Sequence, residues 1–258
     1  MKIGLVQFSP IWEDKKESIE KVNSLLEKIN LSEIELLIFP ELSFTGFSMN
    51  VEQLAEEIDG ESMRYFLKLS ADNKINVFGG LIEKYEDKFY NTLIHFDENG
   101  LIKARYRKIH PFSMTNEDKH FSAGKEIVVT KIGHIRFGLS ICYDLRFPEL
   151  YRLLALKGAE VLVNIANWPV PRIAHWELLT QATAVQQLAY FIGVNRTGDD
   201  PYNSYSGSTC IVSPAGEDLV RNFNDEKIIV YDIDVEEVNK IRKKFPFLED
   251  VKLISAKD

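Results

Sequence analysis

Short apolar runs of strand length recur along the chain and are separated by polar and charged segments. The runs are rich in β-branched and aromatic residues, which favour extended backbone on a half-buried sheet. We therefore predict a strand at each of these runs: KIGLVQF, ELLIFP, INVFGGL, YNTLIHF, LIKARYR, IRFGLSIC, EVLVNI, YFIGVN, TCIVS and KIIVYDI.

Helical periodicity occurs between some of these strands. Apolar side chains spaced three and four residues apart share one face of a helix. Two such stripes are present, and they consist of Ile19, Val22, Leu25, Leu26 and Ile29, and of Trp176, Leu179, Ala182, Val185 and Ala189. Further helices are predicted after Pro148 and after Asp234, because proline suits the first turn of a helix and aspartate suits the N-cap.

Two turn signals indicate that some neighbouring strands pair antiparallel. Asn99-Gly100 separates two strand-like runs, and VSPAGEDLV, around Gly216, separates another two. Strands that alternate with helices and also form hairpins predict a mixed α/β layered fold. With 45% hydrophobic residues and no Pro-, Gly- or Ser-rich linker, we expect a single domain over residues 1–258.

The composition limits which kinds of binding partner and which cellular location we expect. The 39 acidic residues outnumber the 31 basic ones, for a net charge of −8, which disfavours binding to nucleic acid or to an anionic membrane. No run approaches the roughly 18 consecutive apolar residues that a membrane helix needs. Two distant cysteines, and an opening MKIGLVQF without signal-peptide character, indicate a reducing, cytoplasmic setting.

The stretch GLSICYDLRFPEL places Cys142 where a predicted strand gives way to a turn and then to a helix. Ligands of α/β sheets bind at strand ends, and the backbone N–H groups after such a residue can face an oxyanion. Most cysteines that end an apolar strand are inert core thiols, and this interpretation suits Cys210. Cys142 is therefore weighed both as a packed thiol and as a nucleophile.

A catalytic cysteine needs a base or a nearby cation, because a thiol with an ordinary pKa of about 8.5 is mostly protonated at neutral pH. Glu41 and Lys108 both follow apolar strands; taken singly, they would be a solvated loop carboxylate and a strand-edge cation. A papain-like pairing of Cys142 with His110 or His175 stays open on spacing. The histidines lack metal-site spacing, so we expect no metal.

Three motifs in one order, FPELSFTGF, YRKIHPF and ICYDLRFPEL, resemble the nitrilase superfamily of carbon–nitrogen hydrolases, and the resemblance extends to SPAGE and YDIDVEEV. It implies an α-β-β-α four-layer sandwich with mixed sheets, which pairs into a homodimer or a higher homo-oligomer. It also implies a catalytic triad of Glu41, Lys108 and Cys142. Glu117, in the long loop of residues 110–126, matches the second glutamate that positions the substrate and the lysine.

The resemblance further implies a reaction that these residue types can carry out. Glu41 removes the thiol proton of Cys142, and the thiolate attacks an amide carbon. Lys108 and the backbone N–H of Tyr143 hold the oxyanion. Ammonia then leaves, and water hydrolyses the thioester without an organic cofactor or a metal.

Within the superfamily, CYDLRFPEL and the stretch from NWPVPRIAHW to GVNRTGDD look most like the omega-amidase group, which hydrolyses the terminal amide of 2-oxo acids such as 2-oxoglutaramate. Arg146 then binds the substrate carboxylate through its bidentate fork, or forms a structural ion pair with Glu149. Phe47 and Trp168 are expected either on the pocket wall or in the core.

Arg172 and Arg196, each in a loop after a strand, are secondary cation candidates. QATAVQQLAY departs from the ARAIENQ pattern of relatives. The sequence therefore supports the assignment to the omega-amidase group less strongly than it supports the catalytic triad. The alternatives are another amide or N-carbamoyl hydrolase of the superfamily, because pocket walls decide the substrate, and a catalytically silent binding module on the same fold.

Overall fold

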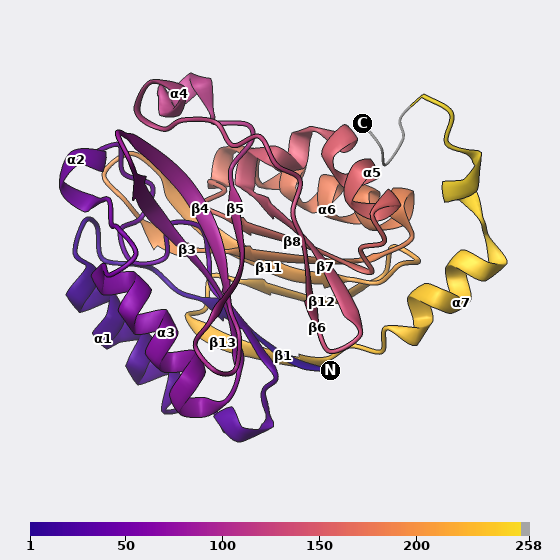
Figure 1. Cartoon of the computed structure of the whole chain (residues 1–258), viewed down its shortest axis with the longest axis horizontal. Helices are drawn as coiled ribbons and strands as arrows, with labels where there is room; N and C mark the ends of the chain where they lie inside the picture. The colour runs from indigo at the N-terminus through magenta and orange to yellow at the C-terminus, as the bar shows by residue number, and fades with distance from the viewer. Residues whose placement is uncertain (254–258) are drawn as a thin grey trace.

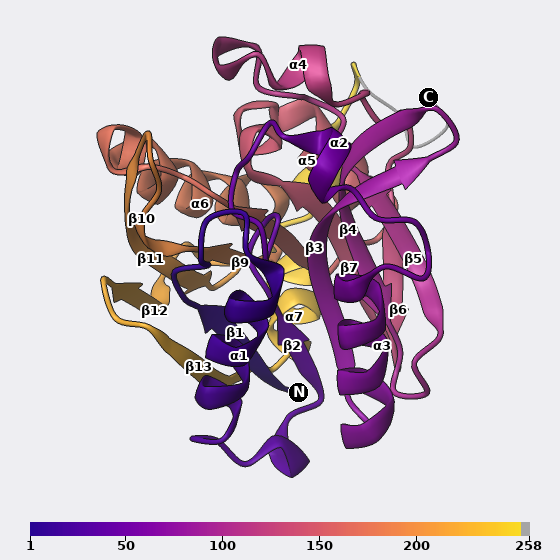
Figure 2. The same ribbon diagram turned by 90° about the vertical axis from the view of Figure 1, so that its left-hand side faces the viewer.

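The computed structural model of the chain describes residues 1–253, which form four layers (Figure 1). Two β-sheets pack face to face, and helices cover their outer faces. Figure 2 shows α3 (Glu61–Asn73) and α6 (Ile173–Gln187) on opposite sides of the strands. This is the α-β-β-α sandwich that the sequence resemblance implies. Residues 254–258 of the predicted domain lie outside the described residues.

The first sheet has six strands in the spatial order β13-β1-β2-β3-β4-β5. Their bounds, in that order, are Lys227–Asp232, Lys2–Gln7, Leu36–Ile38, Asn76–Tyr85, Lys88–Phe96 and Ile102–Arg107. β1, β2 and β3 run parallel, whereas β13, β4 and β5 join by antiparallel pairing. The sheet is therefore mixed, and the predicted Asn99-Gly100 turn is the hairpin between β4 and β5.

The second sheet has seven strands, six of them in the order β10-β11-β9-β8-β7-β6, with β12 paired to β11. Their bounds are Thr197–Asp199, Ser204–Val212, Tyr190–Asn195, Val161–Ala166, Ile135–Ile141, Val129–Ile132 and, for β12, Asp218–Phe223. β7, β8 and β9 run parallel at its centre. The hairpin predicted around Gly216 joins β11 to β12. The short strands β6 and β10 were not predicted, although β6 lies within the apolar, β-branched run IVVTKI.

Four of the helices are those that the periodicity and cap signals predict: α1 (Lys15–Leu26), α5 (Pro148–Leu156), α6 and α7 (Glu236–Lys244). α7 has Val235 at its N-cap, although the Asp234 carboxylate still accepts the Glu236 N–H at 3.1 Å. The helix α3 and the one-turn helices α2 (Val51–Leu54) and α4 (Glu117–His120) were not predicted. Within residues 1–253, no helix is both long and apolar enough to cross a bilayer.

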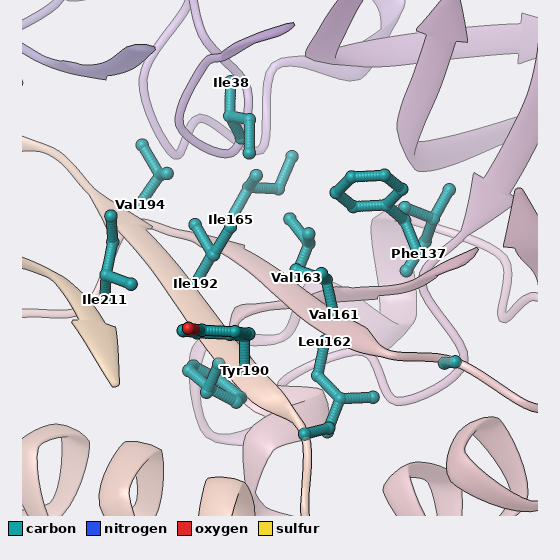
Figure 3. Packing of buried hydrophobic residues seen from close by; sticks show 14 of the residues in the cluster. Ile38, Phe137, Val161, Leu162, Val163, Ile165, Tyr190, Ile192, Val194 and Ile211 are labelled. Atoms are coloured by element: carbon teal, nitrogen blue, oxygen red, sulfur yellow. The ribbon is translucent and has the colours of Figure 1, made fainter. Parts of the chain in front are cut away.

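The apolar residues of the first sheet divide between two cores because successive side chains of a strand point to opposite faces. Val6 and Val77 pack against α1 and α3, whereas Ile38 belongs to the core between the sheets. Figure 3 shows Ile38 facing Ile165 of β8, while Leu162 of β8 points the other way, toward the helices. The inter-sheet core thus fixes the position of one sheet relative to the other.

The inward face of α6 differs from the predicted stripe. Its buried residues are Trp176, Thr180, Thr183, Ala184 and Gln187, and Val185 is 45% exposed. The prediction for Val185 is wrong because the buried face of α6 carries Trp176 together with small and polar side chains, and Val185 lies outside that face. The apolar side chains of Leu178 and Val185 are left on the outer face.

A buried histidine ties the two sheets together. His95 of β4 contacts Thr130 Oγ1 of β6 at 2.7 Å and Asn76 Oδ1 of β3 at 3.0 Å. Because Asn76 Oδ1 can only accept, the ring donates through Nε2 and accepts the Thr130 hydroxyl at Nδ1. Burial lowers the pKa of His95 to about 4, so the ring is neutral near neutral pH.

Candidate active site

The expected catalytic residues meet at the carboxyl ends of strands from both sheets. Glu41 follows β2 and Lys108 follows β5 in the first sheet, whereas Cys142 follows β7 in the second. Glu117 opens α4, which lies at the top of the sandwich in Figures 1 and 2. The structure therefore brings four predicted residues, distant in sequence, to one end of the inter-sheet core.

Lys108 lies between two carboxylates. Its Nζ is 2.9 Å from Glu41 Oε1 and 2.9 Å from Glu117 Oε2, and all three side chains are at most 1% exposed. Burial opposes the charge on Lys108, but Glu117 and Glu41 outweigh it and raise the pKa of the lysine. Lys108 is therefore a fixed cation, unlike the exposed strand-edge lysine of the alternative interpretation.

The loop after Lys108 folds around the carboxylate of Glu117. The Phe112 N–H donates to Glu117 Oε2 at 2.6 Å, and Asn116, with a left-handed φ of 59°, turns the chain into α4. Burial raises the pKa of Glu117, although Lys108 acts in the opposite direction. A carboxylate this deep needs its donors, because an unpaired buried charge costs several kcal/mol.

Cys142 occupies the turn between β7 and a 3₁₀ segment over Cys142–Arg146. It is half-buried and has a φ of 45°, a left-handed backbone that non-glycine residues rarely adopt and that recurs at functional turns. Burial raises the pKa of its thiol, Glu41 raises it further, and Lys108 lowers it. The resting sulfur is thus a protonated thiol that needs a base to become a nucleophile.

Asp144 fastens this turn to the strand end that carries Lys108. Its buried carboxylate accepts the Ile141 N–H at 2.9 Å, the Tyr106 hydroxyl at 2.7 Å, and the His110 N–H and Nδ1 at 3.1 and 2.7 Å. These bonds hold residues from both sheets. The nucleophile turn and the lysine are therefore fixed relative to each other.

The two histidines of the papain-like alternative have other contacts. His110 pairs with Asp144 and stacks on Phe147 with ring centroids 3.7 Å apart. His175 is exposed, and its Nδ1 lies 3.1 Å from Nη2 of Arg146. The geometry thus favours Glu41 and Lys108, rather than a histidine, as the partners of Cys142.

A cavity opens beside Cys142, and about 80 Å³ of it is accessible to a water-sized molecule. Its lining carries three cations, Lys108, Arg146 and Arg172, and no carboxylate among the described residues. The other lining residues are Phe47, Phe112, Thr115, Tyr143, Asn167, Trp168, Pro169, Asn203 and Tyr205. Such a cavity favours a small anionic ligand.

Phe47 and Trp168 were expected either on the pocket wall or in the core. Phe47 and Trp168 both line the cavity, with the Arg146 guanidinium 4.9 Å from the centre of a Trp168 ring. Arg172 lines the cavity too, 5.1 Å from the Phe112 ring. Arg196 is instead a buried structural arginine that donates to the carbonyls of residues 197 and 199.

Two buried asparagines at the site were missed by the sequence analysis. Asn167, directly after β8, donates its N–H to Glu41 Oε2 at 2.7 Å and its Nδ2 to the Glu41 carbonyl at 2.7 Å. Asn91, in β4, contacts the carboxylates of Glu41 and Glu117. Strand-end position could have indicated Asn167, and hairpin register across from Lys108 could have indicated Asn91.

The fold and the cysteine-bearing cavity are those expected of a carbon–nitrogen hydrolase, and comparison with known proteins shows that class. The model of the carbon-nitrogen hydrolase family matches residues 2–243, and the chain belongs to this family. It is similar to a 2-oxoglutaramate amidase of Bacillus subtilis, with 33% identity over 97% of each chain. It is 30% identical to an omega-amidase of Homo sapiens, over 95% of this chain and 92% of the relative.

A solved structure agrees with the assignment. A CN-hydrolase superfamily protein from Xanthomonas campestris, described with an arsenic adduct in its active site, aligns with a TM-score of 0.93. The two sequences are 27% identical, and the alignment covers 98% of both chains. The four-layer architecture is therefore that of the superfamily.

Proposed function

We propose that this chain hydrolyses the terminal amide of a small 2-oxo acid, such as 2-oxoglutaramate, to a carboxylate and ammonia. The observation that carries the proposal is the cavity in which a protonated thiol stands beside a buried lysine–carboxylate cluster and two further cations. The cluster supplies the acid–base chemistry, and the cations suit an anionic substrate. The names of the relatives add support for the 2-oxo acid.

The reaction begins with transfer of the Cys142 thiol proton to Glu41, and the sulfur attacks the amide carbon. Lys108 and the Tyr143 N–H stabilise the tetrahedral oxyanion; one such donor is commonly worth a hundredfold or more in rate. The carbon–nitrogen bond then breaks as Glu41 returns the proton to nitrogen, and ammonia leaves. A thioester remains on the sulfur.

The second half uses the same carboxylate. Glu41 accepts a proton from water, the resulting hydroxide attacks the thioester carbon, and the carbon–sulfur bond breaks as Glu41 returns the proton to sulfur, which restores the thiol and the Glu41 carboxylate. Glu117 holds Lys108 in place through both halves. Arg146, with Arg172 nearby, pairs with the substrate carboxylate, because a guanidinium offers the two parallel donors that a carboxylate accepts.

The test is ammonia release by the purified protein from a panel of amides. The panel contains a 2-oxo acid with a terminal amide, the amino acid with the same amide, and N-carbamoyl amino acids, each measured also with Cys142→Ala. Cys142-dependent turnover that favours the 2-oxo amide supports the proposal. Preference for the N-carbamoyl compounds would assign another hydrolase activity. No turnover, together with slow alkylation of Cys142, would indicate a silent binding module.

We also propose that two copies associate through the outer face of α6. Leu178 is 66% exposed and Val185 is 45% exposed on this helix, and burying them against a second copy removes apolar surface from water. Sedimentation should report a dimer of the wild-type chain, and Leu178→Glu should shift it toward monomer. A monomeric wild type would contradict the association.

A further inference from the structure

Asn91 stands at the centre of the buried charge cluster. It lies in β4 and is 1% exposed, and its backbone carbonyl accepts the Lys108 N–H at 2.9 Å across the β4–β5 hairpin. Its Nδ2 is 2.7 Å from Glu41 Oε1 and 2.9 Å from Glu117 Oε1. One side-chain amide thus touches both carboxylates that flank the lysine.

Donors and acceptors alternate around a closed ring. Lys108 Nζ lies 2.9 Å from Glu41 Oε1 and 3.0 Å from Glu117 Oε1, the same two oxygens that Asn91 contacts. The amide nitrogen has two hydrogens, so each carboxylate receives one. The orientation of the amide is determined by chemistry, because a flipped amide would aim its oxygen at two carboxylates.

The ring fixes the orientation of the Glu41 carboxylate. Oε1 accepts hydrogen bonds from Asn91 and Lys108, whereas Oε2 accepts them from the backbone N–H of Asn167 at 2.7 Å and from its Nδ2 at 3.3 Å, beside the cavity. Without Asn91, the carboxylate could rotate between these environments. The two carboxylates, which share Lys108, would also lose the amide donor that lies between them, and buried like charges favour retention of a proton.

We propose that Asn91 is a positioning residue that holds the carboxylate of Glu41 in one orientation for the reaction and keeps Glu117 ionised beside it. It acts through the carboxylates and does not touch the substrate, so it bears on kcat rather than on KM. The kinetic test of this inference rests on the proposed function, because it measures turnover of an amide. Among the described residues, the titratable groups facing this ring are Glu41, Glu117, Lys108 and Cys142.

The kinetic test uses Asn91→Ala, which removes both donor hydrogens, and Asn91→Asp, which keeps the shape and replaces the donors with acceptors. Asn91→Ala should lower kcat by about tenfold to a hundredfold with KM within about twofold, since bonds to charged groups are worth this much. Asn91→Asp should lower kcat by more than Asn91→Ala does. Donors that favour the ionised form are gone, so the acid limb of the kcat profile should move to higher pH, by about one unit.

A matched control separates positioning from the general cost of a buried asparagine. Asn76 is also buried in the first sheet, but its side chain contacts His95, away from the cavity. Asn76→Ala should lower the melting temperature and leave the acid limb unmoved. If Asn91→Ala and Asn76→Ala behaved alike in pH profile and kcat, or if Asn91→Asp kept wild-type kcat, the proposal would be overturned.

A substrate-free readout keeps this test distinct from that of the proposed function. Infrared titration of the carboxyl band, with Glu117→Gln as the reference for assignment, follows protonation of the cluster directly. In Asn91→Ala the midpoint should rise by about one pH unit even if no amide is turned over. An unchanged midpoint refutes the positioning role. A raised midpoint in a chain that turns over no amide of the panel removes the proposed function and leaves the positioning role intact.

Discussion

Removing the buried lysine is the sharpest test of how the charge cluster is held together. In Lys108→Met, the carboxylates of Glu41 and Glu117 keep their amide donors but lose their only cation in the cluster. Stranding buried charge in this way costs about 3–5 kcal/mol of unfolding free energy at a pH where both groups ionise. Lys108 acts to lower the pKa of Glu117, so its removal raises that pKa further.

The pH dependence follows from the retained proton. The folded variant holds a proton that the unfolded chain, with glutamate pKa near 4.3, has already released. The wild-type chain also holds Glu117 at a raised pKa, so the gap between variant and wild type widens only from that pKa up to the still higher pKa of the variant, by up to about 1.4 kcal/mol per pH unit within that window. The variant should therefore lose stability relative to wild type as pH rises through the window.

Urea unfolding followed by circular dichroism, at several pH values from 5 to 8.5, measures this gap. The matched control is Lys84→Met, because Lys84 forms an exposed pair with Glu57 at 3.3 Å; it should cost less than about 0.5 kcal/mol at every pH. A Lys108→Met loss under about 1 kcal/mol, or one independent of pH, would refute the reasoning that the cluster is buried and mutually dependent.

Four further outcomes are expected. Cys142→Ala should lower ammonia release on the order of 10⁴-fold or more, while calorimetry still detects binding of the 2-oxo acid. Arg146→Lys should raise KM by about tenfold with little change in kcat, since lysine cannot make the bidentate contact. Gly80→Ala would place a methyl group 2.7 Å from the Pro40 carbonyl, so both kcat and melting temperature should fall. In wild type, the unfolded chain binds a proton at His95 between pH 6.5 and 4 that the buried ring does not bind, so the free energy of unfolding falls by up to about 3 kcal/mol over this range. In His95→Gln this part of the acid destabilisation should be absent.

The strands could be predicted from sequence because β-branched runs in a two-sheet core leave a strong local pattern. Helices were less certain for a physical reason. α6 packs through Thr180, Thr183 and Ala184 as well as through Trp176, so choosing its buried face by hydrophobicity alone placed Val185 there wrongly. α3 was missed although Met63, Phe66 and Leu69 repeat at helical spacing.

The residues of the site also differ in how far a local sequence pattern reveals them. Glu41, Lys108 and Cys142 could be named from motifs that each follow a strand, and Glu117 from its place in the long loop of residues 110–126; the structure brings all four together. Their hydrogen-bond partners could not be named, because the role of an asparagine such as Asn91 depends on carboxylates 26 and 50 positions away. Only the three-dimensional pairing of strands and loops makes those contacts.

The division of the site between two sheets has a consequence for how activity is lost. Cys142 follows a strand of one hydrogen-bonded slab, whereas Glu41 and Lys108, its partners in the proposed mechanism, follow strands of the other. A lateral slip of about 1 Å between the slabs would cost about a hundredfold in rate while every ladder stayed intact. Under pressure or mild heating, activity should therefore be lost before any spectroscopic sign of melting. The rate of turnover thus reports how the two layers are aligned.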